Sequence, residues 1–162
     1  MLFKTFSKLT KYPSYHKINK QLFIGDYSSS KNNNFLKSNK INVIVNCSKN
    51  LELNSNNKIN YRVNVNDDFT SASAIIMYKY IIHLIPLLNK HINNNDIILI
   101  HCRCGIQRSA TVLAALLMYR YRISKTEAIK IIKNKRFITF LPAPNFNISL
   151  DIYEKYLIQN KK

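Results

Sequence analysis

Residues 97–109 read IILIHCRCGIQRS, and this stretch decides how the rest of the chain is interpreted. Its first four residues form an apolar run that is typical of a buried strand. The loop that follows carries a thiol at Cys102 and a guanidinium at Arg108, and an apolar segment with helical character begins directly after it. A cysteine and an arginine on a loop between a strand and a helix indicate phosphate chemistry.

The physical reason is the geometry of the loop backbone. If residues 102–108 wrap into a cradle, successive N–H groups point inward and bind phosphoryl oxygens, helped by the positive end of the following helix. Arg108 closes the cradle, because its planar fork holds two oxygens at once. The same field stabilises a thiolate at Cys102, which we predict to be the nucleophile. The predicted phosphate-binding residues are Arg103, Cys104, Gly105, Ile106, Gln107 and Arg108.

Gly105 strengthens this interpretation. The chain has only two glycines in 162 residues, and Gly105 is one of them. A residue without Cβ is useful where the backbone approaches a ligand or adopts positive φ. We therefore expect Gly105 to shape the cradle.

The pattern His101-Cys102-x-x-Gly105-x-x-Arg108-Ser109 is similar to the signature of the cysteine-dependent protein tyrosine phosphatase superfamily. The Ser-Ala-Thr-Val that starts at Ser109 resembles its dual-specificity branch, in the compact form found in poxviruses. The similarity extends over roughly residues 18–158, so a chance match of the loop alone is a poor explanation. The other matching segments are Leu22–Gly25, Ile41–Asn46, Lys133–Arg136 and Pro144–Asn147.

The resemblance implies a catalytic domain over residues 18–162 that hydrolyses phosphotyrosine, phosphoserine and phosphothreonine through a cysteinyl-phosphate, with phosphorylated proteins as substrates. It implies no metal and no other cofactor. At 162 residues the chain has the size of one domain. Classical tyrosine-specific domains are longer and carry an extra loop that deepens their pocket, so we expect a shallow cleft here.

A neutral acid near the leaving oxygen must supply a proton when the thiolate attacks a phosphate monoester. Asp67 is the predicted acid, because it follows an expected strand where the family places its acid-bearing loop. Family members often have proline where this chain has Asn64, and this departure leaves Asp68 as an alternative. Either aspartate would also serve as a cap of the following helix.

Two further residues have roles that the resemblance implies. Ser109 would donate a hydrogen bond to the departing thiolate, a role compatible with capping the helix that follows. His101 would orient the loop and support the thiolate without contacting the substrate.

The remaining cysteines leave two alternatives open. A zinc site at His101, Cys102 and Cys104 would need four ligands, and no second paired cluster is visible in the sequence. Cys47 and Cys104 are plain thiols by default. The sharper hypothesis is that one of them traps oxidised Cys102 as a disulfide.

The apolar patterning predicts an α/β fold, with a central, mostly parallel sheet of four to five strands flanked by helices and a site at the carboxyl ends of the strands. Strands are expected near residues 21–24, 41–47, 59–65 and 96–101. Helices are expected over 35–40, over 73–92 with a kink at Pro86, over 109–121, after a capping box at Ser124–Glu127, and over 145–158.

Residues 1–17 precede the family match and carry apolar side chains at the spacing of one helical face. Compact poxvirus phosphatases use an N-terminal helix for dimerisation, so the resemblance predicts a helical, dimerising segment and a homodimer. Size and composition favour a large DNA virus as the source.

The formal net charge is +17, and Lys, Asn, Ile and Tyr are all abundant. An A/T-rich coding sequence explains this composition, whereas a functional basic surface would attract acidic phosphoproteins, nucleic acid or a membrane. No membrane-spanning run is expected. Three cysteines without a signal-like segment favour a reducing, cytoplasmic location, in a host cell or a virion.

Three other functions compete with the protein phosphatase. Relatives of the same fold act on RNA 5′ ends or on phosphoinositides, but the histidine and lysine that those enzymes tend to carry are replaced here by Cys104 and Ile106. The basic surface keeps RNA as the runner-up. A phosphate-binding adaptor without turnover would usually lack the nucleophile, the arginine or the acid, and this chain has candidates for all three.

Overall fold

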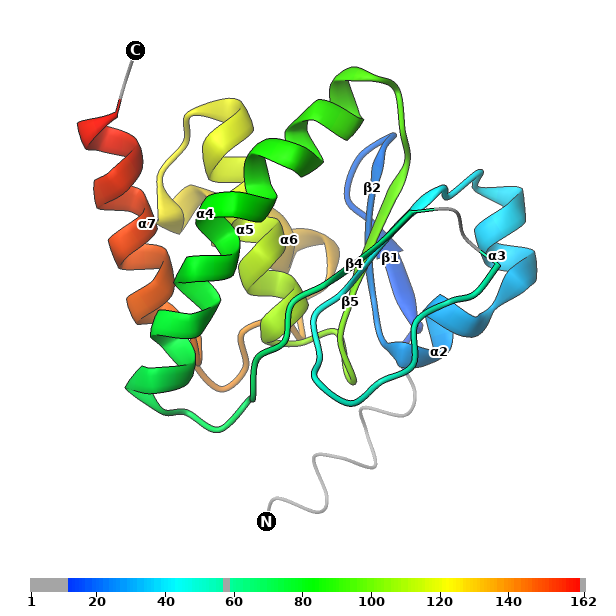
Figure 1. Ribbon diagram of the computed structural model, residues 1–162, viewed down its shortest axis with the longest axis horizontal. Helices are drawn as coiled ribbons and strands as arrows, with labels where there is room; N and C mark the ends of the chain where they lie inside the picture. The colour runs from blue at the N-terminus through cyan, green and yellow to red at the C-terminus, as the bar shows by residue number, and fades with distance from the viewer. Residues whose placement is uncertain (1–11, 57–58, 161–162) are drawn as a thin grey trace.

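The protein is described by a computed structural model that covers residues 12–56 and 59–160. A central sheet separates two layers of helices of unequal size (Figure 1). The strands are β1 (Tyr15–Lys17), β2 (Leu22–Gly25), β3 (Val43–Asn46), β4 (Ile59–Arg62) and β5 (Ile98–His101). The helices are α2 (Tyr27–Lys31), α3 (Asn33–Ser38), α4 (Ser71–Asn93), α5 (Arg108–Tyr121), α6 (Lys125–Lys135) and α7 (Asn147–Gln159).

The sheet has the order β1-β2-β5-β3-β4, with β5 in the centre. β2, β5, β3 and β4 run parallel, and β1 pairs antiparallel with β2 at one edge. The prediction of a mostly parallel sheet of four to five strands flanked by helices is confirmed. Because the parallel strands end at one edge, the loop after β5 lies beside the last residues of β2 and β3.

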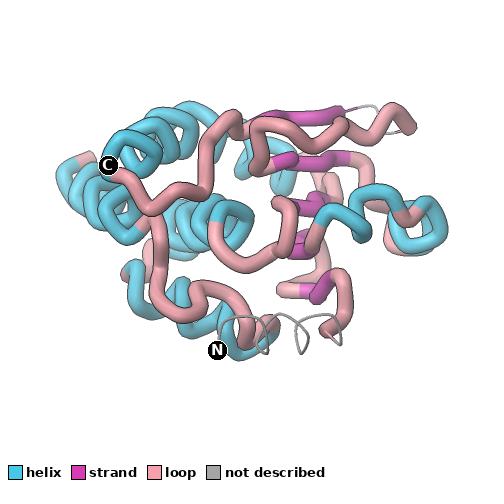
Figure 2. The backbone as a smooth tube through the Cα atoms, turned by 90° about the horizontal axis from the view of Figure 1, so that it is seen from below, coloured by secondary structure: helices cyan, strands magenta, loops and turns pink. Residues whose placement is uncertain are grey.

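Alternating side chains of the three central strands face different helix layers, as the twofold period of a strand requires. One face, with residues such as Leu22, Val43 and Ile98, joins the larger core beneath α4, α5, α6 and α7. The other face, with Phe23, Ile44 and Leu99, joins a smaller cluster with α3. Seen along the sheet, the helices lie on both sides of the column of strands (Figure 2).

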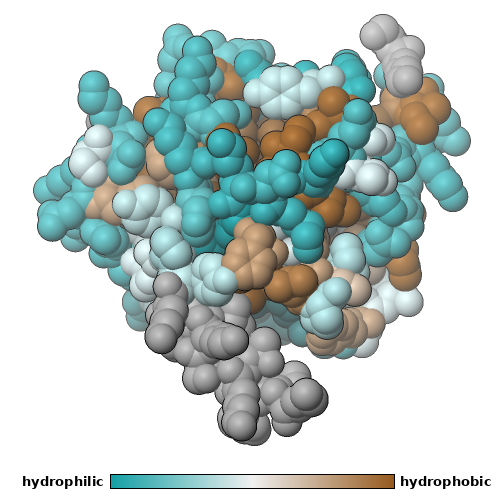
Figure 3. Space-filling model, turned by 180° about the vertical axis from the view of Figure 1, so that it is seen from behind, coloured by the Kyte–Doolittle hydropathy of each residue, from teal (hydrophilic) through white to brown (hydrophobic). Residues whose placement is uncertain are grey.

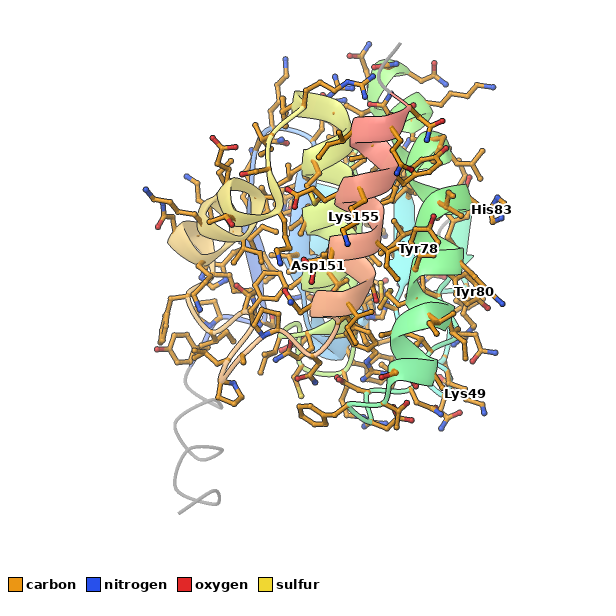
Figure 4. The ribbon with its side chains drawn as sticks, turned by 90° about the vertical axis from the view of Figure 1, so that its left-hand side faces the viewer. Lys49, Tyr78, Tyr80, His83, Asp151 and Lys155 are labelled. Atoms are coloured by element: carbon orange, nitrogen blue, oxygen red, sulfur yellow. The ribbon has the colours of Figure 1, made fainter. Side chains whose placement is uncertain are left out.

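α5 is the central helix of the larger layer. Its residues from Ser109 to Met118 are all buried, as expected for a helix that is apolar on most sides. α4 and α7 lie side by side on the outside of this layer, where Figure 4 labels Tyr78, Tyr80 and His83 of α4 and Asp151 and Lys155 of α7.

The capping box that was expected at Ser124 is present. The Glu127 N–H donates to the Ser124 hydroxyl, and the Ser124 N–H donates to the Glu127 carboxylate. These two bonds satisfy backbone donors that helix geometry leaves unpaired, and α6 begins directly after them. α4 continues through Pro86 as a single helix.

Two elements were not predicted. β1 lies inside the segment 1–17 that the sequence analysis separated from the domain, and Tyr15–Lys17 belong to the sheet. α2 follows β2 directly, because Asp26 caps it by accepting the Ser29 N–H. The predicted N-terminal helix and its dimerising role fall largely on residues 1–11, which lie outside the described residues.

Within the described residues, α4 is the helix that is long and apolar enough to cross a membrane by length and composition. A row of its side chains, including Met77, Ile81 and Leu88, lies in the larger core, and the helix packs on α5 and α7. These contacts place one side of α4 in the core. The face of the molecule in Figure 3 is mostly hydrophilic, with apolar patches between polar side chains.

Candidate active site

The carbonyl groups of the loop after β5 are held on its outer side. The Arg103 carbonyl accepts the backbone N–H of Tyr27 at 3.2 Å, and the Ile106 carbonyl accepts that of Phe140 at 2.9 Å. Arg136 donates to the two carbonyls between them. Because a planar trans peptide points its N–H opposite to its C=O, the N–H groups that follow these carbonyls point to the inner side. The loop backbone therefore has the arrangement of a nest, with N–H groups on its inner side.

Arg136 is the main anchor of this loop. Its side chain is buried, and it donates from Nε to the Gly105 carbonyl at 3.0 Å and from Nη2 to the Cys104 carbonyl at 3.2 Å. Nη1 lies 2.8 Å from the Pro13 carbonyl and 2.9 Å from His16 Nδ1. In the sequence, Arg136 stands out only as part of a segment that matches the family, because its role depends on contacts that no local pattern reveals.

Both glycines of the chain meet at this loop. Gly105 has φ of +66°, and a Cβ on it would lie 2.5 Å from the Gly25 carbonyl oxygen. Gly25 ends β2 opposite His101 in the register of the sheet. The end of β2 therefore packs against the cradle so closely that no side chain fits at Gly105.

The Cys102 thiol lies at the base of the cradle. It is 2% exposed, and the Gly105 N–H donates to its Sγ at 3.3 Å. Ser109 Oγ also lies 3.3 Å from Sγ. α5 begins at Arg108, so its positive end points toward this sulfur and toward any anion above it. Ser109 lies one residue inside the helix, and Gln107 holds the N-cap position.

A chain of polar contacts joins the cradle to the predicted acid. Arg108 Nε lies 3.3 Å from Asp67 Oδ2, and the two side chains form an ion pair. The other oxygen of Asp67, Oδ1, accepts a hydrogen bond from Asn145 Nδ2 at 2.7 Å. Asp67 thus faces the cradle, and Asn145 is a contact that the sequence analysis did not identify.

Asp68 has a different environment. Its carboxylate accepts hydrogen bonds from the N–H and the hydroxyl of Thr70, which is the N-cap of α4. These bonds lower the pKa of Asp68. The two aspartates are therefore divided between two tasks: Asp68 supports the start of α4, and Asp67 lines the cleft above Cys102.

The side chain of Gln107 fixes the wall formed by the loop between α6 and α7. Its Nε2 donates to the carbonyls of Leu141 and Ala143, both at 2.9 Å, and its Oε1 accepts the Asn145 N–H at 3.1 Å. Gln107 was predicted to bind phosphate through its backbone. In the structure its side chain positions the loop that carries Asn145.

His101 lies in the sheet directly before the nucleophile. It is 1% exposed, its ring stacks on Tyr27, and burial lowers its pKa to about 4. The imidazole is therefore neutral at pH 7 and does not line the cleft. This placement fits a positioning role.

The other predicted residues are spread over the rim and the core. Arg103 and Cys104 are exposed and Ile106 is half-buried, and all three line the cleft. Cys47 is fully buried after β3, and burial raises the pKa of its thiol. All three cysteines are free thiols. Across residues 12–56 and 59–160, no group of three or more His, Cys, Asp or Glu side chains is arranged to hold a metal ion.

A family comparison identifies this arrangement. Residues 22–156 match the model of the dual specificity phosphatase catalytic domain, and the chain belongs to that family of phosphatases, in a compact form within the protein tyrosine phosphatase superfamily. A search of curated proteins found no match.

Solved structures share the fold. Human DUSP28 is 22% identical, with a TM-score of 0.81 over 91% of this chain and 97% of its own. The human tyrosine phosphatase-like serine/threonine/tyrosine-interacting protein is 19% identical, with a TM-score of 0.78 over 89% and 97%. PTPMT1, solved in complex with PI(5)P, is 15% identical, with a TM-score of 0.70 over 92% and 100%.

Proposed function

We propose that the protein is a dual-specificity protein phosphatase that uses Cys102 as its nucleophile. The observation that carries this proposal is the nest itself, with inward N–H groups, a sulfur at its base and Arg108 at its rim. These groups bind a phosphoryl group and place the sulfur behind the phosphorus atom.

The proposed reaction has two steps. The Cys102 thiolate attacks phosphorus, the bond to the ester oxygen breaks, and Asp67 gives its proton to the leaving oxygen. A water molecule then attacks the cysteinyl-phosphate, Asp67 takes a proton from it, and the S–P bond breaks to release inorganic phosphate. Ser109, 3.3 Å from Sγ, stabilises the thiolate as it leaves.

The test is a substrate panel of phosphotyrosyl peptide, phosphothreonyl peptide, phosphoinositide and triphosphorylated RNA. The parent protein should hydrolyse the two peptides, and Cys102→Ser should bind them without turnover. Equal turnover by parent and Cys102→Ser would reject the mechanism. Binding without turnover by the parent would favour the adaptor, and preferential turnover of RNA or phosphoinositide would favour those alternatives.

The location and the assembly of the protein are also proposals. We propose an intracellular protein, in the host cell or the virion of a large DNA virus, on the basis of its cysteine content and composition. Sedimentation of the full chain over a range of concentrations tests the predicted homodimer.

A further inference from the structure

We propose that the cleft selects aryl phosphates, and therefore phosphotyrosine over phosphothreonine, because Phe69 and Leu141 contact the substrate ring. The inference rests on the proposed function, since it concerns the substrate of that same site. It assigns a specificity role to two residues outside the signature loop.

Phe69 combines an exposed apolar ring with an unfavourable backbone conformation. Phe69 is 73% exposed, which is the highest value among the large apolar residues that the structure describes. Its φ of +61° is unusual for a residue with a Cβ. The fold regains little from a ring that remains in water. Strained, exposed residues of this kind cluster at ligand-binding sites. Phe69 lines the cleft together with Asp67, two residues before it.

Leu141 provides a second apolar surface on the same cleft. It is 43% exposed, it is followed in the lining by Pro142, and it comes directly after Phe140, whose φ is +60°. Gln107 accounts for its position, because the Gln107 amide donates to the Leu141 carbonyl. The apolar residue is therefore held in place before any substrate arrives, which lowers the entropic cost of binding.

The two ends of the cleft differ in chemistry. The base has inward N–H groups, the thiol and Arg108, whereas Phe69, Leu141, Pro142 and Ile106 contribute apolar side chains to its walls. A phosphotyrosine matches both ends, since its phosphate meets the base and its ring meets the walls. A phosphothreonine presents only a methyl group and its own backbone there. An inositol ring would bring hydroxyl groups against these apolar walls.

The experiment compares two peptides that differ only in phosphotyrosine or phosphothreonine. Aromatic ring contacts are worth a factor of about three to ten, so Phe69→Ala should lower kcat/KM for the phosphotyrosyl peptide by that factor and leave the phosphothreonyl peptide within about twofold. Leu141→Ala should act in the same direction. Phe137→Ala is the matched control, because Phe137 is 53% exposed but lies outside the cleft and packs on Tyr12.

The sign of the effect separates ring contact from disturbance of the acid. A displaced Asp67 would slow the phosphothreonyl peptide more, because an alkoxide needs the proton more than a phenoxide does. A larger loss on the phosphothreonyl peptide, or an equal loss on both, would overturn the proposal. Phe69→Gly removes the ring and relieves the positive φ, so it should show the same selective loss in a chain that still folds.

Binding distinguishes a failure of this inference from a failure of the proposed function. In the Cys102→Ser background, the phosphotyrosyl peptide should bind more weakly when Phe69 is replaced, whether or not the parent turns over. Tighter binding of the phosphothreonyl peptide by the Cys102→Ser protein would overturn the inference and leave the phosphatase activity intact. Absence of turnover in the parent would reject the proposed function alone.

Discussion

Replacing Gly105 by alanine should damage both stability and anion binding. An L-residue held at φ of +66° costs about 1–2 kcal/mol. The new Cβ would also lie 2.5 Å from the Gly25 carbonyl oxygen and 2.7 Å from the carbonyl carbon, so either the cradle or the end of β2 must move. Overpacking of this kind costs about 1–3 kcal/mol. We therefore expect Gly105→Ala to lose about 2–5 kcal/mol of the free energy of unfolding.

The same substitution should weaken the site in the part that still folds. The Gly105 N–H donates to Sγ, and the Gly105 carbonyl holds Arg136, so a shift of this residue disturbs both sides of the cradle. Removing an oriented donor from such a site typically costs about 10²-fold in kcat. Urea unfolding measures the stability, and inhibition by vanadate measures how well the nest binds an anion.

Cys104→Ala is the matched control, since it changes the exposed neighbour on the same loop and should alter the free energy of unfolding by less than about 0.5 kcal/mol. If Gly105→Ala unfolds at the parental urea concentration and binds vanadate as tightly as the parent, the close packing of β2 on the cradle is wrong.

Three further predictions concern the supports of the site. Asn145→Ala should lower kcat for a phosphothreonyl peptide by about tenfold, because Asp67 loses the hydrogen bond from Asn145. In an Asp67→Ala background the same substitution should cause no further loss of kcat. Arg136→Met should lower the free energy of unfolding, measured with urea, by about 3–5 kcal/mol, because two cradle carbonyls lose their buried donor. Arg103→Ala on the exposed rim is the control and should leave the free energy of unfolding nearly unchanged. The pKa of His101 is lowered to about 4 in the folded protein, so between about pH 4 and 6.5 the unfolded chain binds more protons than the folded one. The free energy of unfolding should therefore fall by up to about 3 kcal/mol as the pH drops through that range. In His101→Gln the free energy of unfolding should lack this part of its pH dependence. If the variant and the parent show the same pH dependence, the burial of a neutral imidazole at His101 is wrong.

The parts of the fold that the sequence could predict are those with strong local patterns. The apolar run before His101, the capping box at Ser124 and the long apolar pattern of α4 each fix an element from neighbouring residues. The observed boundaries differ from the expected ones by up to three residues, as for α5, which begins at Arg108 and not at Ser109. β1 was missed because three residues at an edge of the sheet carry too short a pattern.

The candidate site likewise has parts that the sequence could predict and parts that it could not. The thiol, Gly105 and the guanidinium lie between residues 102 and 108, so their spacing alone predicts that they act together. The contacts of Asn145 with Asp67 and of Arg136 with the cradle join residues that are far apart in the chain. Sequence spacing does not encode such contacts, because they depend on how β2, α6 and the loop before α7 pack around β5.

The cradle and Asp67 are held by different kinds of contact. The cradle carbonyls are held by Tyr27, Arg136 and Phe140, which contact the outer side of the loop. Asp67 is held by Asn145 and by Arg108, and in the proposed mechanism Arg108 is also the group that binds the phosphoryl oxygens. Phosphate binding would therefore compete with the proposed acid for one guanidinium. Asn145 is then the contact that keeps Asp67 near the leaving oxygen once Arg108 has turned to the substrate, which is why its loss should appear in kcat more than in KM.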